Sequence, residues 1–130
     1  QVQPDSDYLK YFLRFNLKDI QKHLPEFEFV PENDQMIFFI LRNVVPAGLV
    51  IGKPFGANGL LLLLDFVIPG YRDSKIGDFI FRLRSDFFEE RGFNRIYSKP
   101  GSKDHSAYLR RMGFAPGSGE YAAYYILELS

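Results

Sequence analysis

The stretch Leu64–Tyr97, LDFVIPGYRDSKIGDFIFRLRSDFFEERGFNRIY, determines how the rest of the chain is interpreted. It begins inside a long apolar segment, Leu60 to Ile68, which is typical of a strand buried on both faces. The polar turn Tyr71 to Gly77 follows, and apolar residues then recur at helical spacing from Ile76 to Phe87. Arg95 to Ser98 is a second strand candidate. This succession of strand, turn, helix and strand predicts that part of the sheet is parallel.

The remaining elements follow from apolar periodicity and from the turn and capping residues between them. Asp5, Ser6 and Asp7 offer capping side chains for a helix that Pro25 ends. The other predicted elements are a hairpin of Met36–Leu41 and Ala47–Lys53, a turn at Ala57–Gly59, a helix capped by Asp104 that runs to Met112, and a final strand over Tyr121–Leu129. The predicted order is α-β-β-β-α-β-α-β, an α/β (α+β) fold with a mixed, partly parallel central sheet flanked by helices.

Composition narrows the class of protein. The 130 residues suit a single domain over residues 1–130, and Lys+Arg balances Asp+Glu at 16 each. A nucleic-acid binder usually has a basic excess, so no nucleic-acid partner is expected. The chain contains no cysteine, which removes disulfides, thiolate metal sites and a Cys nucleophile, and fits a cytoplasmic location. Because the chain begins at Gln1, we also consider a fragment of a longer protein, with a membrane segment before it and the domain on the cytoplasmic face.

The turn before the predicted helix has the chemistry of an anion site. A helix N-terminus presents unpaired N–H groups and a partial positive charge, which favour a phosphate or pyrophosphate. Arg72 and Lys75 would lie near such an anion, and Gly77 lets the backbone approach it closely. The alternative interpretation of these residues is a turn with solvated charges before an ordinary helix.

The wider pattern resembles the GNAT superfamily of acyl-CoA-dependent N-acyltransferases, as a divergent, uncharacterised bacterial subgroup. In that family a strand ends in a segment like Ile68–Arg72, a loop of the type found at Arg72–Gly77 follows, and a later helix closes on residues like Met112–Phe114. The resemblance covers roughly residues 36–114. It implies a GNAT-like mixed sheet and transfer of an acyl group, with acetyl expected, from acyl-CoA to an unidentified amine by direct attack in a ternary complex. A homodimer is left open, and no metal is expected.

The resemblance also implies which residues hold the co-substrate acetyl-CoA. Backbone groups of Phe66, Val67 and Ile68 would contact the pantetheine arm and the thioester carbonyl. Backbone N–H groups of the loop would hold the pyrophosphate, at Arg72, Asp73, Ser74, Lys75, Ile76, Gly77 and Asp78. Lys75 stands where the family has its first glycine, and the negative charge of Asp73 is unfavourable near an anion unless it faces away.

Three residues are candidates for acid and base catalysis. Many family members use a Tyr five residues before the closing Phe, which here is Leu109, so Tyr108 is one position out of register. His105 lies about one helical turn before Leu109 and has a side chain suited to proton transfer near neutral pH. Asp65 is a carboxylate in an apolar strand, and it could act as a base or form a hydrogen bond within the sheet. The alternative for His105 is a solvated residue in the first turn of a helix.

A hydrolase and a catalytically inactive ligand-sensing domain are the alternatives to an acyltransferase. The residues Ser98, Ser102, Asp104 and His105 resemble parts of a hydrolase triad, but no Gly-x-Ser-x-Gly elbow is present and clustering in sequence is not triad geometry. The strongest alternative is a catalytically inactive domain with the same fold, which senses a ligand or regulates an attached segment. Lys75 and Leu109 favour that alternative because both depart from the family pattern.

Overall fold

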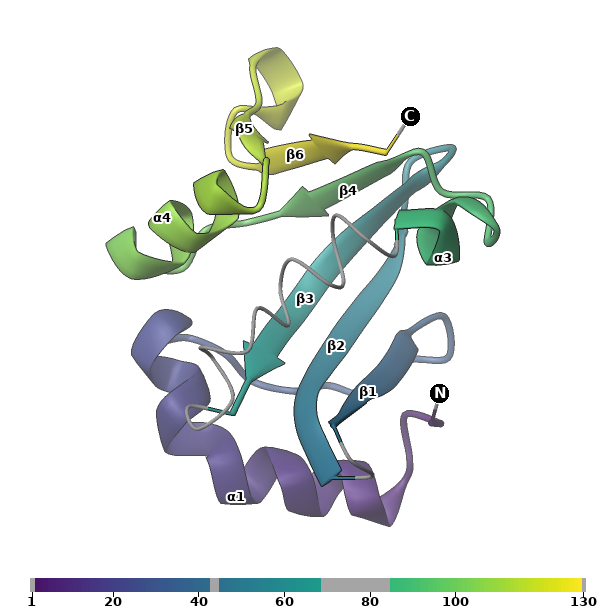
Figure 1. Cartoon of the computed structure of the whole chain (residues 1–130), viewed down its shortest axis with the longest axis vertical. Helices are drawn as coiled ribbons and strands as arrows, with labels where there is room; N and C mark the ends of the chain where they lie inside the picture. Colours follow the sequence, from purple (N-terminus) through teal and green to yellow (C-terminus); the bar gives the residue numbers. More distant parts are fainter. Residues whose placement is uncertain (1, 43–44, 69–84, 130) are drawn as a thin grey trace.

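The computed structural model describes residues 2–42, 45–68 and 85–129 (Figure 1). The elements in chain order are α1 Asp7–His23, β1 Met36–Arg42, β2 Val45–Phe55, β3 Gly59–Val67, α3 Ser85–Glu89, β4 Arg95–Ser98, α4 Lys103–Arg111, β5 Ala115–Pro116, the 3₁₀ helix η3 Gly119–Tyr121 and β6 Tyr125–Glu128. The described strands form one sheet of six in the order β1-β2-β3-β4-β6-β5. Strands β3 and β4 are parallel, whereas the other neighbours are antiparallel. The predicted mixed sheet flanked by helices is confirmed.

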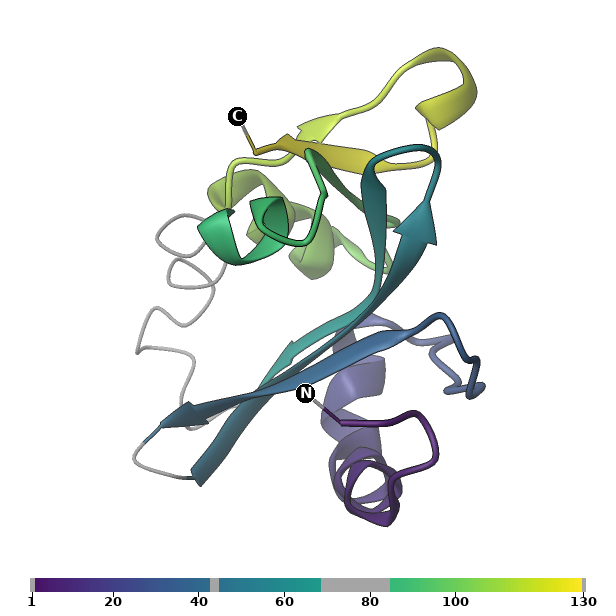
Figure 2. The same ribbon diagram turned by 90° about the vertical axis from the view of Figure 1, so that its right-hand side faces the viewer.

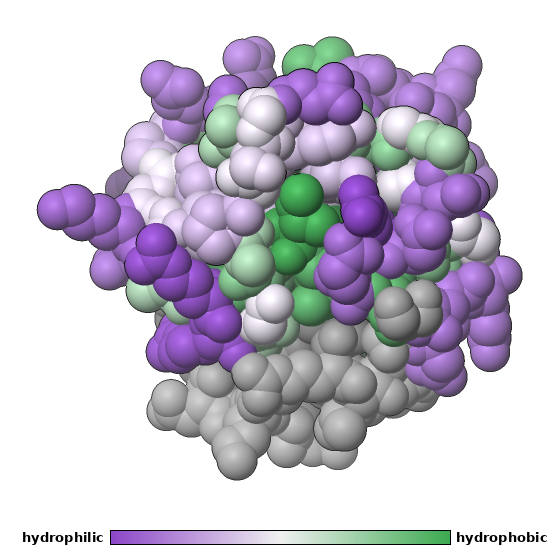
Figure 3. All heavy atoms as spheres, turned by 90° about the horizontal axis from the view of Figure 1, so that it is seen from above, coloured by the Kyte–Doolittle hydropathy of each residue, from purple (hydrophilic) through white to green (hydrophobic). Residues whose placement is uncertain are grey.

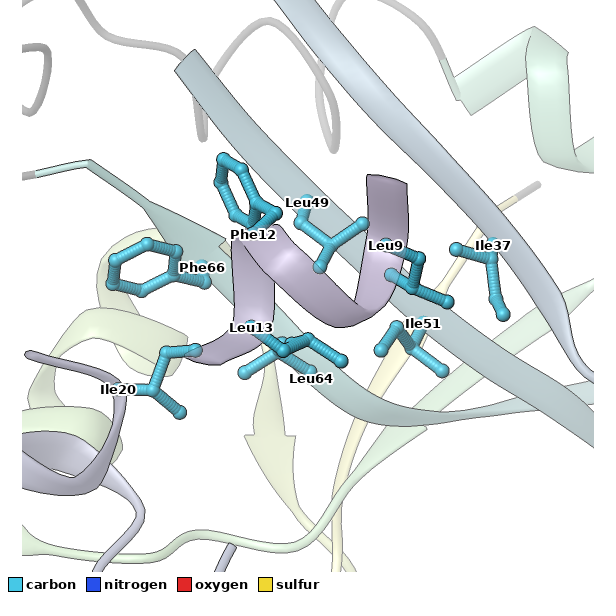
Figure 4. Packing of buried hydrophobic residues seen from close by; sticks show 9 residues of the cluster. All are labelled: Leu9, Phe12, Leu13, Ile20, Ile37, Leu49, Ile51, Leu64 and Phe66. Atoms are coloured by element: carbon cyan, nitrogen blue, oxygen red, sulfur yellow. The ribbon is translucent and has the colours of Figure 1, made fainter. Parts of the chain in front are cut away.

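Helix α1 packs on one face of the sheet. Ser6 caps it by accepting a hydrogen bond from the Leu9 N–H at 3.3 Å, and the helix ends at His23, two residues before Pro25. Its apolar face packs on the β1, β2 and β3 side chains to form one core cluster (Figure 4), made of Leu9, Phe12, Leu13, Ile20, Ile37, Leu49, Ile51, Leu64 and Phe66. Burial of this face holds the helix to the sheet.

Helices α3 and α4 lie on the opposite side of the sheet from α1 (Figure 2). They contribute to a second core cluster, made of Ala47, Val50, Leu60, Leu62, Phe88, Ile96, Leu109 and Phe114. Gly113, with φ 96°, follows α4 in the left-handed conformation that glycine adopts at helix ends. The surface at the β5 and β6 end of the molecule is mostly hydrophilic around a smaller apolar area (Figure 3).

A β-bulge in β3 changes which face its side chains occupy. The pairing with β2 shifts by one residue so that Leu63 has no partner between Leu62 and Leu64. In a regular strand Leu62 and Leu64 would share a face, yet Leu62 packs with α4 and Leu64 packs with α1. After the bulge, Asp65 therefore points to the α4 side of the sheet.

Several predicted boundaries are corrected by the structure. Ser102, not Asp104, caps α4, because its hydroxyl accepts the His105 N–H at 3.1 Å. The predicted final strand is shorter, because residues 119–121 form a 3₁₀ helix and the strand β6 begins at Tyr125. The short strand β5 was not predicted. The helix predicted over Ile76–Phe87 lies mainly outside the described residues, and the described part of that range belongs to α3.

None of the helices in the described ranges combines the length and the apolar character that crossing a membrane requires.

Candidate functional site

Strands β3 and β4 part from each other in the middle of the sheet (Figure 1). Their parallel pairing runs from Gly59 and Arg95 to Leu62 and Ser98, where β4 ends. Strand β3 continues to Val67, beyond the end of its pairing with β4. The point of parting coincides with the bulge at Leu63, as bulges often accompany a change in pairing next to a functional site. The end of β3, where the family resemblance places the pantetheine arm, therefore lies beyond the pairing with β4.

The edge of β3 beyond Leu62, where the pairing with β4 has ended, is called the parted edge. The backbone groups that face it differ from those expected. The Ile68 N–H donates to the Ala47 carbonyl at 2.8 Å, which places it on the β2 side. Because neighbouring residues of an antiparallel strand alternate in direction, the Phe66 amide also faces β2, and those of Asp65 and Val67 face the parted edge. The expectation that Phe66 and Ile68 present backbone groups to a pantetheine arm is wrong in register by one residue. For Val67 the contact stays a prediction.

Asp65 and His105 form a buried pair beside the parted edge. The bulge turns Asp65 of β3 toward α4, and the Ser102 cap places His105 in the first turn of α4. Their side chains are 4% and 5% exposed, and His105 Nε2 lies 3.2 Å from Asp65 Oδ1, although the residues are 40 positions apart in the sequence. The interpretation of His105 as a solvated residue is therefore wrong.

The surroundings of the His105 ring define its tautomer. The Gly101 N–H donates to Nδ1 at 3.1 Å, and because a backbone amide can only donate, Nδ1 carries a lone pair. In a neutral imidazole the other nitrogen then holds the proton, so Nε2–H donates to Asp65 Oδ1. Both ring nitrogens are therefore engaged in hydrogen bonds.

The second oxygen of Asp65 lacks a partner. Among the buried side-chain nitrogen and oxygen atoms of the described residues, Asp65 Oδ2 is the one without a hydrogen bond. A buried carboxylate oxygen without a donor is costly, and such an atom in a native structure calls for an explanation. A ligand that supplies a hydrogen-bond donor or a positive charge would satisfy it.

Tyr108 completes the group of predicted catalytic residues that the structure brings together. It lies one turn after His105 on α4, and the two rings stack with centroids 6.4 Å apart and planes 12° apart. Leu109, at the usual position of the family tyrosine, is 0% exposed in the core. The residue that replaces the tyrosine therefore serves packing.

The remaining predictions concern the pyrophosphate loop, the hydrolase triad and a metal site. Arg72, Asp73, Ser74, Lys75, Ile76, Gly77 and Asp78 lie outside the described residues. The hydrolase interpretation finds no support, because the His105 ring bonds to Gly101 and Asp65, and the Ser102 hydroxyl is used as a helix cap. Within the described ranges no three His, Asp or Glu side chains gather as a metal site would require.

Sequence reasoning named Asp65 and His105 separately but missed their pairing and missed Gly101. The signal for Gly101 was the Pro100-Gly101-Ser102 turn before α4, which places a backbone N–H and a capping hydroxyl next to a histidine. No local signal pointed from this turn to Asp65.

Comparison with known proteins gives matches in structure alone. No family model matches the sequence, and no curated protein matches it. An acetyltransferase of the GNAT family from Staphylococcus aureus Mu50 has a TM-score of 0.60 and 16% identity, over 88% of this chain and 77% of that one. GCN5 from Tetrahymena has a TM-score of 0.67 and 12% identity, over 92% of this chain and 88% of that one.

A third solved structure contains a bound molecule. The PaiA N-acetyltransferase from Thermoplasma acidophilum, in complex with coenzyme A, has a TM-score of 0.56 and 18% identity, over 73% of this chain and 61% of that one. At these identities the likeness concerns the arrangement of the chain in space. The chain has the fold of the GNAT superfamily.

Proposed function

We propose that this chain transfers an acyl group, with acetyl expected, from acyl-CoA to an amine. The observation that carries the proposal is the parting of β3 from β4 after Leu62 and Ser98, which leaves a strand edge for an extended ligand to pair with. Two of the similar solved structures described above are acetyltransferases, and the PaiA N-acetyltransferase is in complex with coenzyme A. The turn Arg72–Gly77, whose residues favour binding of an anion, closely follows β3 in the sequence and supports acyl-CoA as the ligand.

The site residues suit a direct attack of the amine on the thioester. The backbone of Asp65 faces the parted edge, where it would hold the pantetheine arm and orient the thioester. Asp65, His105 and Tyr108 lie together beside that edge, so groups of the kind that proton transfer requires are next to the proposed thioester position. Holding both substrates in one complex would supply much of the rate enhancement through orientation.

Calorimetry and a thiol-release assay test this proposal. We expect acetyl-CoA and CoA to bind with a dissociation constant below the millimolar range, and we expect free thiol to appear when an accepted amine is added to acetyl-CoA. Absence of binding at millimolar acetyl-CoA would refute the proposal. Binding without turnover on any amine would favour the ligand-sensing alternative.

Dephospho-CoA, which retains the pyrophosphate, and free pantetheine, which lacks it, are a matched pair of binding probes. Because the pyrophosphate is expected to interact with the N–H groups of the turn, pantetheine should bind at least about 10-fold more weakly than CoA, a loss of about 1.4 kcal/mol. Equal affinities would mean that the turn Arg72–Gly77 does not hold the pyrophosphate.

A further inference from the structure

We propose that Asp65 Oδ2 receives the ammonium group of the acceptor amine and takes its proton, and that His105 is a positioning residue that acts through Asp65. This inference rests on the proposed acyl transfer and adds the identity of the base and the charge of the acceptor. The acceptor is accordingly an amine that binds in its protonated form.

The hydrogen bonds of His105 leave it no atom with which to act as a base. Its Nδ1 lone pair accepts the Gly101 N–H at 3.1 Å, and its Nε2–H donates to Asp65 Oδ1 at 3.2 Å. To accept a proton from a substrate, the ring would have to give up one of these bonds inside a site where it is 5% exposed. The role that the geometry allows is to hold the Asp65 carboxylate in one orientation.

The free proton-accepting atom of the pair is Asp65 Oδ2. It is buried and unpaired, the side chain is 4% exposed, and the residue sits where β3 leaves β4. Within the described residues, the ionisable side chain that contacts Asp65 is His105, which is neutral in this hydrogen-bond arrangement. A buried carboxylate without a positive partner is unfavourable, and a substrate ammonium would provide both the charge and the missing donor.

The proton transfers balance with no further reactant. The ammonium gives one proton to the Asp65 carboxylate, which becomes a neutral carboxyl group. The amine nitrogen then forms a bond to the thioester carbonyl carbon, and the carbon–sulfur bond breaks with its electron pair on sulfur. The second proton lost by nitrogen goes to the thiolate to give the CoA thiol, and the proton on Asp65 returns to solvent.

Three substitutions separate the two roles. Asp65→Asn keeps the shape and an acceptor for Nε2–H but cannot take a proton. His105→Gln keeps a donor near the position of Nε2 but cannot act as an imidazole base, whereas His105→Leu loses the donor as well. Asp104→Asn is the matched control for loss of a carboxylate charge, because Asp104 is exposed and lies in the same turn of α4 as His105.

The experiment measures kcat, KM for the amine and acetyl-CoA affinity for these variants with spermidine, a lysine-containing peptide and an aminoglycoside as probes. We expect Asp65→Asn to lower kcat by at least about 100-fold, the lower range for loss of a general base, with acetyl-CoA affinity changed less than about 3-fold. His105→Gln should keep kcat within about 10-fold of the wild type, and His105→Leu should lose at least about 100-fold. Asp104→Asn should match the wild type.

Two results would overturn the inference: an active Asp65→Asn, or a His105→Gln that is as inactive as His105→Leu. If His105→Leu does not fold, Asp65→Asn and His105→Gln alone decide, since both retain the hydrogen bond between the two side chains. Failure of the wild type to bind acetyl-CoA would instead refute the proposed function itself, so the two failures are distinguishable.

Discussion

Replacing Asp65 with Asn should make the protein more stable. The carboxylate is 4% exposed, its Oδ1 accepts a hydrogen bond of 3.2 Å from His105, and its Oδ2 has no partner. A buried, unpaired charge costs several kcal/mol, whereas an unsatisfied neutral polar group costs about 1–3 kcal/mol. Asn is nearly isosteric and keeps the acceptor for Nε2–H, so the difference should appear as stabilisation.

The expected gain is about 1–2 kcal/mol in the free energy of unfolding, which for a domain of this size corresponds to a rise in Tm of about 3–8 °C. Urea unfolding at pH 7 measures the free energy, and an unchanged m-value would show that the unfolded states are comparable. Asp104→Asn, an exposed carboxylate, should stay within about 0.5 kcal/mol of the wild type. An Asp65→Asn variant that is less stable by more than about 1 kcal/mol would refute the reasoning, because it would show that the charge itself stabilises the fold.

Three further predictions follow from the site. Ser102→Ala should cost about 1 kcal/mol of stability and lower kcat, because it removes the α4 cap that places His105, whereas Ser118→Ala should be neutral because the Ser118 side chain makes no capping hydrogen bond; urea unfolding and kinetics compare them. Leu109→Tyr, which restores the family residue, should cost about 1–3 kcal/mol by overpacking the core and should not raise kcat. Arg72→Ala should weaken CoA binding in calorimetry by about 10-fold or more, with less effect at high salt, because it removes the charge-assisted contact to phosphate that the family resemblance implies.

Capping and turn residues in the sequence predicted where some helices and strands begin and end. Ser6 was expected among the caps of α1 and is the residue whose hydroxyl accepts the Leu9 N–H. The predicted bounds of β4, Arg95–Ser98, match the structure, since a turn precedes the apolar residues and Pro100 follows them. The assignment of the α4 cap failed because Ser102 and Asp104 are both capping residues, and only the course of the chain through Gly101 selects between them.

The pairing of Asp65 with His105 could not be predicted from the sequence because two nonlocal features create it. The direction of Asp65 depends on the extra residue at Leu63, and no property of a leucine within a run of leucines marks it as the bulge. The distance to α4 depends on the parallel pairing of β3 with β4, which ends at Ser98. Side chains of a strand alternate between its two faces, so one inserted residue moves every later side chain to the other face. An error of one position in the register of β3 would therefore place the Asp65 carboxylate on the α1 face.

The same bulge links the stability and the activity of the site. It lies where β3 parts from β4, and it turns Asp65 toward α4, where the carboxylate is buried next to His105. If the charge is retained for proton transfer, Asp65→Asn must move stability and kcat in opposite directions, since the neutral side chain relieves the buried charge and removes the base. If the pair only held β3 to α4, both quantities would fall together or neither would change. Measuring the two on one protein preparation therefore separates a catalytic carboxylate from a structural one.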